Sequence, residues 1–167
     1  MVEERLEIPQ GITMDINGLQ ITVKGPKGEI TRIFKVHELQ INKQDNFVVL
    51  QGKKLSITRT IKSHINNMFI GVKEGYEKHM KVVFSHFPIS LTVKNNKLEI
   101  KNFIGEKNPR FAKIVKNSEV QINGQDITIK GVDKESVGQT AANLMTATKI
   151  KKLDPRVFQD GIYPKIE

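Results

Sequence analysis

Residues Ser56–Pro88 read SITRTIKSHINNMFIGVKEGYEKHMKVVFSHFP, and the rest of the chain is organised around them. Apolar side chains recur here at steps of three or four residues, which places one apolar stripe on one face of a helix. The stripe consists of Ile57, Ile61, Ile65, Met68 and Val72. Gly71 and Gly75 then weaken the helix, and an alternating run begins at Met80. We therefore expect this helix to close one structural repeat and to lead directly into a second.

The composition limits the class of protein. A chain of 167 residues suffices for one medium domain or two small ones. It contains no cysteine, which excludes disulfides and cysteine metal sites and favours an intracellular setting. Its first ten residues are not a signal peptide, and no apolar run approaches the ~20 residues that a membrane span needs. The sequence predicts a soluble, cytoplasmic protein with no membrane association.

The charge balance points to a class of partner. Lysine and arginine number 27 against 18 acidic residues, which gives a net charge of +9, and the pI is about 9.7. A net charge of several units can serve solubility alone. A pI above ~9 in a compact chain favours a polyanionic partner, most often nucleic acid.

Residues 12–23 predict a β-hairpin, because apolar and polar residues alternate on both sides of an Asn-Gly pair, the strongest short hairpin signal. Folding about Asn17-Gly18 pairs Ile16 with Leu19 and Met14 with Ile21. Strands are expected to follow, and the helix of the opening stretch ends this half of the chain.

The second half repeats the first. Ile12, Met14 and Ile16 recur 77 residues later, Leu39–Asn42 recurs 81 residues later, and Ser56 with Ile57 recurs 80 residues later. Three blocks in the same order indicate an internal duplication, with a first repeat at 1–78 and a second at 79–167. Each repeat places its strands first and one helix last. This predicts an α+β fold: two tandem copies of a mainly antiparallel sheet packed against one helix.

The second repeat should end in a helix and a tail. The helix is expected from about Lys134 to Lys149, and its inward stripe consists of Val137, Ala141, Leu144 and Met145. The tail from Leu153 to Glu167 contains two prolines and a glycine and should be irregular. Its apolar residues, however, are expected to dock on the protein or on an RNA surface.

No constellation of residues indicates an enzyme. The chain lacks a His-Glu-x-x-His pair, a nucleophile elbow and a phosphate loop. The GPKGE turn at 25–29 has two glycines and a lysine but not the spacing of a phosphate loop. We expect no catalytic residue, no metal site, no cofactor and no small-molecule substrate.

The basic residues are unevenly placed. Residues 1–78 have a net charge of +3 and residues 79–167 one of +6. Seven basic residues lie between Lys94 and Lys116, opposed by two glutamates. The segment 102–110, NFIGEKNPR, is longer and more basic than the corresponding turn of the first repeat. Solvated strand lysines are the alternative interpretation, but charge on an extended loop favours phosphate contacts, and few aromatics favour reading of RNA backbone and shape.

Four blocks of the sequence resemble one known family. They are IPQGITMDINGLQITVKGPKGE at the start, NNMFIGVKEGYEKHMKVVFSHFP in the middle, and SVGQTAANLMTATKIK and DPRVFQDGIY near the end. Together they are similar to the L-six ribosomal proteins, the universal sixth protein of the large ribosomal subunit. The last two blocks look like the archaeal and eukaryotic branch of that family.

This resemblance implies a fold, a function and contact residues. Members of the family consist of two tandem α+β domains. They bind large-subunit ribosomal RNA chiefly through the second, near the sarcin–ricin loop and the factor-binding region at the stalk base. By resemblance, Lys107 and Arg110 of the GEK-x-PR loop, and Arg156 and Gln159 of the DPRVFQDG block, contact RNA. Neighbouring ribosomal proteins are the further partners implied.

The resulting hypothesis is a structural ribosomal protein with phosphate contacts from the second repeat. Its predicted RNA-binding residues are Lys101, Lys107, Arg110, Lys113, Lys151, Lys152, Arg156 and Gln159. One alternative is a tandem protein-binding module that acts by strand addition. Another is a small enzyme on an RNA scaffold, which requires a pocket of convergent titratable groups.

Overall fold

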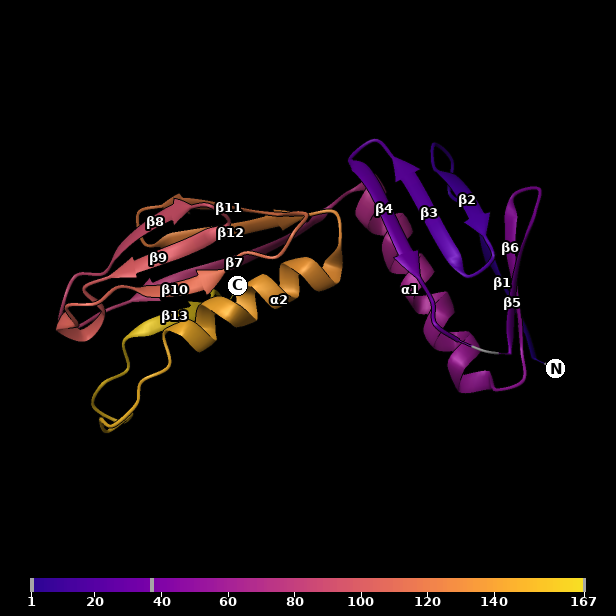
Figure 1. Cartoon of the computed structure of the whole chain (residues 1–167). Helices are drawn as coiled ribbons and strands as arrows, with labels where there is room; N and C mark the ends of the chain where they lie inside the picture. The colour runs from indigo at the N-terminus through magenta and orange to yellow at the C-terminus, as the bar shows by residue number, and fades with distance from the viewer. Residues whose placement is uncertain (1, 37, 167) are drawn as a thin grey trace. The chain divides into compact units, whose positions relative to one another are not determined.

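The computed structural model describes residues 2–36 and 38–166. Contacts divide the chain into two compact units (Figure 1). Unit 1 comprises Met1–Gly75 with Val132–Lys134, and unit 2 comprises Tyr76–Gly131 with Glu135–Glu167. Each unit has its own cluster of buried apolar side chains. Among the described residues, no helix is long and apolar enough to cross a membrane.

Unit 1 consists of two three-stranded antiparallel sheets and one long helix. The sheets have the orders β1-β6-β5 and β2-β3-β4. The elements are β1 (Val2–Glu7), β2 (Thr13–Asn17), β3 (Gln20–Gly25), β4 (Gly28–Ile33), β5 (Leu39–Gln44), β6 (Phe47–Gly52) and α1 (Leu55–Lys73).

The predicted apolar stripe of the first helix is confirmed. Ile61, Ile65, Met68 and Val72 are all buried in the core of unit 1, and Ile57 packs against them. The helix ends where Gly75 takes a φ of +81°, a left-handed conformation that glycine adopts without steric cost. The backbone N–H of Gly75 donates to the carbonyl of Gly71 at 2.9 Å, and β7 starts at the next residue.

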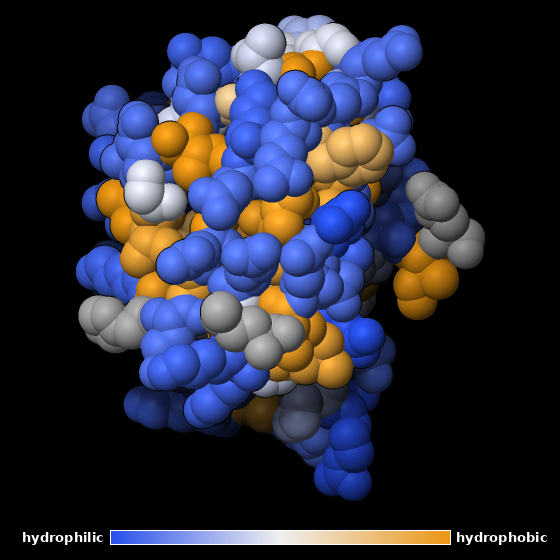
Figure 2. All heavy atoms as spheres, turned by 90° about the vertical axis from the view of Figure 1, so that its right-hand side faces the viewer, coloured by the Kyte–Doolittle hydropathy of each residue, from blue (hydrophilic) through white to orange (hydrophobic). Residues whose placement is uncertain are grey.

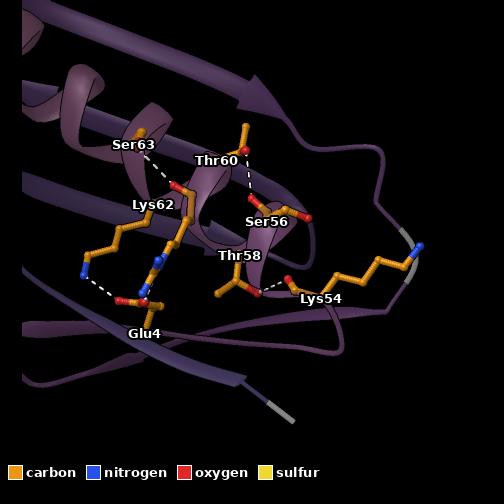
Figure 3. A network of polar contacts seen from close by, with 8 residues as sticks. Glu4, Lys54, Ser56, Thr58, Thr60, Lys62 and Ser63 are labelled. Atoms are coloured by element: carbon orange, nitrogen blue, oxygen red, sulfur yellow. Dashed lines mark hydrogen bonds and ion pairs between the residues drawn. The ribbon is translucent and has the colours of Figure 1, made fainter.

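Glu4 fastens the first strand of unit 1 to this helix (Figure 3). Its carboxylate accepts hydrogen bonds from Nζ of Lys62 at 2.8 Å and from Nε of Arg59 at 3.1 Å. These two bonds, that of Lys62 first, lower the pKa of the Glu4 carboxyl. The basic residues on this face of α1 are therefore engaged within unit 1.

Figure 2 looks onto the surface of unit 1. Hydrophilic side chains dominate it, and apolar side chains reach solvent between them. Exposed apolar residues of unit 1 include Ile33 and Phe47. Apolar residues scattered in this way are normal on protein surfaces and indicate no binding site by themselves.

Unit 2 repeats the same plan and adds one strand. Its sheets have the orders β11-β12-β7-β13 and β10-β9-β8. The elements are β7 (Tyr76–Val83), β8 (Ser90–Lys94), β9 (Lys97–Lys101), the short 3-10 helix η1 (Phe103–Gly105), β10 (Arg110–Lys113), β11 (Ser118–Asn123), β12 (Asp126–Gly131), α2 (Lys134–Ala147) and β13 (Gly161–Pro164).

The order of strands confirms the α+β fold with an internal duplication. The pairing β1-β6-β5 recurs as β7-β12-β11, and β2-β3-β4 recurs as β8-β9-β10. Every strand pair is antiparallel. In both repeats, one helix follows the last of the six strands.

The prediction of an irregular tail was wrong for Gly161–Pro164, which forms β13. This strand pairs antiparallel with β7, so that Ile162 lies opposite Val82. Ile162 is 1% exposed, and its N–H donates to Oγ1 of Thr148 at 3.1 Å. Burial of this apolar side chain against the edge of β7 offsets the conformational entropy that is lost when the tail becomes ordered.

The predicted stripe of α2 was wrong at one position. Val137, Ala141 and Leu144 are buried, but the side chain of Met145 is 40% exposed. Thr140 is fully buried, and its hydroxyl accepts a hydrogen bond from the N–H of Val115 at 3.1 Å. A polar side chain can take this core position because the turn before β11 supplies a partner.

Candidate nucleic-acid interface

Exposed lysines without an acidic partner are more numerous in unit 2 than in unit 1. In the described part of unit 1, five exposed lysines have no carboxylate within 4 Å: Lys27, Lys35, Lys43, Lys54 and Lys73. In the described part of unit 2 there are nine: Lys78, Lys81, Lys97, Lys107, Lys113, Lys116, Lys149, Lys151 and Lys152. An exposed ammonium without an acidic partner is free to neutralise a phosphate and to release its counterion.

The basic loop between β9 and β10, residues 102–109, is anchored by packing. Phe103 is 1% exposed and belongs to the core of unit 2. Gly105 has a φ of +70°, and a Cβ there would lie 3.2 Å from the ring of Phe87. Nδ2 of Asn102 donates to the carbonyl of Pro88 at 3.0 Å. These contacts hold the backbone of the loop that carries Lys107 in place. The corresponding connection in unit 1 is the short turn between β3 and β4.

Arg110 joins this loop to the end of α2. Its guanidinium forms two bonds with the carboxylate of Glu106, at 2.8 and 2.6 Å. Its Nη1 donates to the carbonyls of Ala147 at 3.1 Å and Lys149 at 2.9 Å. Its carbon Cζ lies 4.5 Å from the ring centroid of Phe103, which is a cation–π contact. The bonds from Arg110 lower the pKa of the Glu106 carboxyl, so the pair stays charged at neutral pH.

The tail is held by a second buried contact. The side chain of Asp160 is fully enclosed and accepts hydrogen bonds from His86 Nδ1 at 3.1 Å and from Ser85 Oγ at 3.3 Å. Burial alone raises the pKa of this carboxyl. The bonds from the His86 ring and from the backbone N–H groups of Ser85 and His86 outweigh burial, and the net pKa is lowered. The ring of His86 also stacks on Phe158, with 4.7 Å between centroids.

Three segments therefore meet at one end of unit 2. Residues 85–88 contact both the 102–109 loop, through Phe87 and Pro88, and the tail, through Ser85 and His86. Arg110 then links the loop to the end of α2. Figure 1 shows the loop around η1 and the segment between α2 and β13 at the same end of the unit. We name this end the loop end; Lys107, Lys151, Lys152 and Arg156 lie on its segments.

The predicted residues are divided between two places. Lys101 at the end of β9, Lys107, Arg110, Lys151, Lys152, Arg156 and Gln159 belong to the loop end. Lys113 lies at the opposite end of β10, three residues or roughly 10 Å from Arg110.

Two of these residues are engaged on the tail itself. Arg156 is 89% exposed and pairs with Asp154 at 3.0 Å, and Gln159 Nε2 donates to the carbonyl of Arg156 at 3.3 Å. Both side chains therefore lie at the surface and keep local bonds that an RNA contact would have to replace.

A row of lysines crosses the open face of the β8-β9-β10 sheet. The register places Lys94 opposite Lys97, and Lys97 opposite Lys113. Directly opposed residues on adjacent strands share a face, so three ammonium groups lie side by side. Lys94 and Lys97 were not among the predicted contacts, although the Asn95-Asn96 turn signalled this register in the sequence. Glu99 on the same face lies 3.9 Å from Lys94 and 3.6 Å from Lys101.

Among the residues that the structure describes, no cluster resembles a metal centre. The described residues contain no group of three or more histidine and acidic side chains that could hold a metal ion. A cavity of about 490 Å³ lies between the end of α2 and the tail, and its titratable lining residues are Lys149 and Tyr163. An amine and a phenol without an acid or a histidine among the lining residues do not make a catalytic set.

Comparison with known proteins gives a consistent result. A family model described as ribosomal protein L6 matches residues 8–75 and 87–161. The chain is 48% identical over 167 residues to the large ribosomal subunit protein uL6 of Methanobrevibacter smithii, which covers 97% of this chain and 94% of that protein. It is 48% identical over 172 residues to the protein of the same name from Archaeoglobus fulgidus, covering 96% and 88%. The similarity to uL6 of Sulfurisphaera tokodaii is 46% over 166 residues, covering 96% and 89%.

Proposed function

The chain belongs to the ribosomal protein L6 family, and we propose from this premise that it is a structural component of the large ribosomal subunit that binds large-subunit ribosomal RNA mainly through its second repeat. The family consists of structural proteins and not of enzymes, in agreement with the sequence prediction. The relatives reported above are archaeal, in agreement with the branch that the motifs resemble. The protein acts at the ribosome in the cytoplasm.

The observation that carries this proposal is the set of exposed cations on unit 2, of which Lys107, Lys113, Lys151 and Lys152 have no acidic partner. Lys101, Lys107, Lys151, Lys152 and Arg156 bind phosphates at the loop end. Lys113 binds a phosphate from the lysine row, and Gln159 adds a polar contact. Because the loop end is tied by packing and hydrogen bonds, its charges are held in register for a folded RNA. Backbone and shape recognition of this kind is common for structured RNA.

The site of action is part of the proposal. The second repeat, residues 79–167, binds near the sarcin–ricin loop and the factor-binding region at the stalk base. The first repeat, whose net charge is +3 against +6 for the second, serves as a brace toward neighbouring ribosomal proteins. Support comes from the family and from the larger number of exposed, unpaired lysines in unit 2.

The rival function, protein binding by strand addition, has less support. One edge of β7 is already occupied by the chain's own β13, and the other by β12. The lysines of β8 and β10 also discourage edge pairing on the second sheet of unit 2. A binding module of that kind would not sediment with ribosomes and would bind its partner independently of salt.

A charge-matched pair of variants tests the proposal. The first carries Lys107→Ala, Lys151→Ala and Lys152→Ala in unit 2. The second carries Lys27→Ala, Lys35→Ala and Lys54→Ala, three exposed lysines of unit 1. Both lose the same net charge. Binding to deproteinised large-subunit ribosomal RNA is titrated from low to high salt.

The unit 2 variant should bind more weakly, and the slope of log affinity against log salt should fall by about 3 in magnitude, one per lost phosphate contact. The unit 1 variant should behave nearly as the wild type. Equal losses in both variants would contradict an interface on the second repeat. In cell extracts, wild-type protein should sediment with the large subunit in a sucrose gradient at moderate salt.

A further inference from the structure

We infer that Arg110 and Glu106 form a positioning clamp for the RNA-binding surface. In this role Arg110 orients other residues through its pair with Glu106 and does not itself bind a phosphate. The clamp fixes the 102–109 loop to the end of α2, and thereby sets where Lys107 stands relative to Lys149, Lys151 and Lys152. This inference rests on the proposed RNA-binding function. It concerns how the surface is assembled.

The guanidinium of Arg110 has little capacity left for a phosphate. An arginine side chain carries five N–H donors. Four of them point at internal acceptors: two at the carboxylate of Glu106, and two at the carbonyls of Ala147 and Lys149. The side chain is 23% exposed, and the ring of Phe103 covers one face of the guanidinium plane. A phosphate that bound it would have to displace a two-pronged carboxylate pair, which is among the stronger hydrogen-bonded pairs.

The acceptors of Arg110 explain what the clamp does for binding. The carbonyls at the end of a helix lack intrahelical partners and form the negative end of its dipole. Arg110 satisfies one such group, the carbonyl of Ala147, together with the carbonyl of Lys149 two residues beyond the helix, and places a positive charge there. Without it, an approaching phosphate would meet bare carbonyl oxygens just before Lys151 and Lys152. The clamp removes this repulsion and orders the chain that carries these lysines.

Both ends of the clamp adjoin proposed phosphate ligands. Glu106 directly precedes Lys107, and the carbonyl of Lys149 is two residues before Lys151. Holding Glu106 and the 147–149 backbone on a single guanidinium therefore fixes the spacing of these lysines. A lysine at position 110 would keep the charge but has a compact ammonium that cannot satisfy four acceptors in a planar fork.

Replacing either of two glutamates by glutamine distinguishes the clamp from a simple charge effect. Glu106 and Glu99 each remove one unit of positive charge from the same basic region. Glu99 lies within 4 Å of Lys94 and Lys101, and its Oε2 has no hydrogen-bond partner among the described residues. If charge alone matters, Glu106→Gln and Glu99→Gln both tighten RNA binding. If the clamp matters, Glu99→Gln tightens binding or leaves it unchanged, and Glu106→Gln weakens it several-fold.

The experiment titrates full-length protein with deproteinised large-subunit ribosomal RNA. It compares wild type, Glu106→Gln, Glu99→Gln, Arg110→Lys and Arg5→Lys. Arg5 of unit 1 is the control because it forms an exposed pair with Glu3 outside the proposed interface. We expect Arg110→Lys to bind several-fold more weakly although its charge is kept, and Arg5→Lys to bind as the wild type. In the Arg110→Lys background, Lys107→Ala should cost less affinity than it does in the wild type, because coupled residues are not additive.

Amide hydrogen exchange provides an independent measurement. Within the loop, the N–H of Gly105 donates a hydrogen bond to the carbonyl of Asn102, and the N–H of Glu106 donates to the carbonyl of Phe103. They should exchange faster in Glu106→Gln, whereas the amides of α1 in unit 1 should keep their wild-type rates. This readout also shows whether each variant is folded.

The outcomes distinguish failure of the clamp from failure of the proposed function. Tighter binding by Glu106→Gln together with wild-type binding by Arg110→Lys would overturn the clamp and leave RNA binding intact. If no variant, including the triple lysine variant, lost affinity for RNA, the proposed function would be overturned. In that case unchanged exchange at Gly105 and Glu106 in Glu106→Gln would overturn the clamp as well, and faster exchange would sustain it as a structural link.

Discussion

Nδ1 of His86 lies 3.1 Å from Oδ1 of Asp160, a residue 74 positions further along the chain. The carboxylate of Asp160 is fully enclosed and also accepts hydrogen bonds from Ser85. The pair thus ties the connection between β7 and β8 to the residue that precedes β13. It makes the docking of the tail depend on one buried charge.

Acid should release the tail of this protein. The folded state lowers the pKa of Asp160, so the unfolded state binds a proton more readily, and the contribution to stability is complete above the ordinary carboxyl range near pH 4. It is lost as pH falls through the lowered pKa of the folded state. The protection factor of the Ile162 amide against hydrogen exchange should therefore fall below about pH 4.

Two substitutions control this experiment. Asp160→Asn should lower Ile162 protection at neutral pH and remove its dependence on acid. Asp154 also has a lowered pKa, because of Arg156, but lies at the surface of the same tail. Asp154→Asn should keep the acid dependence of the wild type. Constant protection of Ile162 down to pH 3 in wild type would contradict the role of Asp160.

Thr148→Val should loosen β13. The hydroxyl of Thr148 accepts from the buried N–H of Ile162 and donates to the carbonyl of Leu144 at 3.1 Å. Valine has nearly the same shape but leaves that N–H without a partner, which costs about 1–3 kcal/mol of unfolding free energy. Thr60→Val is the matched control, since the exposed hydroxyl of Thr60 bonds a helix carbonyl (Figure 3) and should cost less than about 0.5 kcal/mol. Chemical denaturation measures both, and equal losses would argue against the Thr148 contact.

Two glycines of unit 2 should respond to alanine with opposite signs. A Cβ at Gly131 would lie 2.6 Å from the backbone oxygen of Asn117 and 2.8 Å from Val137, so Gly131→Ala should destabilise by about 1–3 kcal/mol. A Cβ at Gly138, within α2, meets no atom within 4 Å. Gly138→Ala should stabilise by up to about 1 kcal/mol, because alanine favours helix over glycine. Thermal melts of the two variants compare the signs directly.

Phe103 should be the side chain that holds the basic loop. It is 1% exposed, whereas Phe111 on the adjacent strand is 58% exposed. Phe103→Ala should cost about 3–5 kcal/mol and weaken RNA binding, because it removes the core anchor beneath Arg110. Phe111→Ala should change stability by less than about 0.5 kcal/mol. Similar melting temperatures for the two variants would contradict the anchoring role.

The first hairpin shows what hydrophobic periodicity can and cannot predict. The sequence predicted the correct strands and the correct buried face. It predicted the wrong register, in which Ile16 pairs with Leu19. In the structure Ile16 pairs with Ile21 and Met14 with Val23, and the loop is Gly18-Leu19. A shift of two residues keeps every side chain on its face, so the apolar pattern could not distinguish the two registers. The carbonyl of Leu19 instead accepts from the N–H of Phe34, a contact outside the hairpin.

The tail and the second helix show the same limit. Prolines and a glycine in the last fifteen residues indicate irregular chain, and Met145 continues the apolar period of α2. The edge of β7 and the hydroxyl of Thr148 nevertheless make part of the tail a strand, and a partner at Val115 lets Thr140 replace Met145 in the core. Because these outcomes depend on contacts between groups that are distant in the sequence, local propensities cannot predict them.

The sequence by itself determined the duplicated α+β fold, the helix stripe at Ile61 to Val72 and the concentration of positive charge in the second half. These follow from period, spacing and composition, which act locally or add up over the chain. Only the tertiary structure decided which cations stand unpaired, that Lys113 lies apart from the loop end, and that Arg110 is bound to Glu106, Ala147 and Lys149. The physical reason is that hydrogen bonds and ion pairs are fixed by distances of about 3 Å, which packing between remote segments sets.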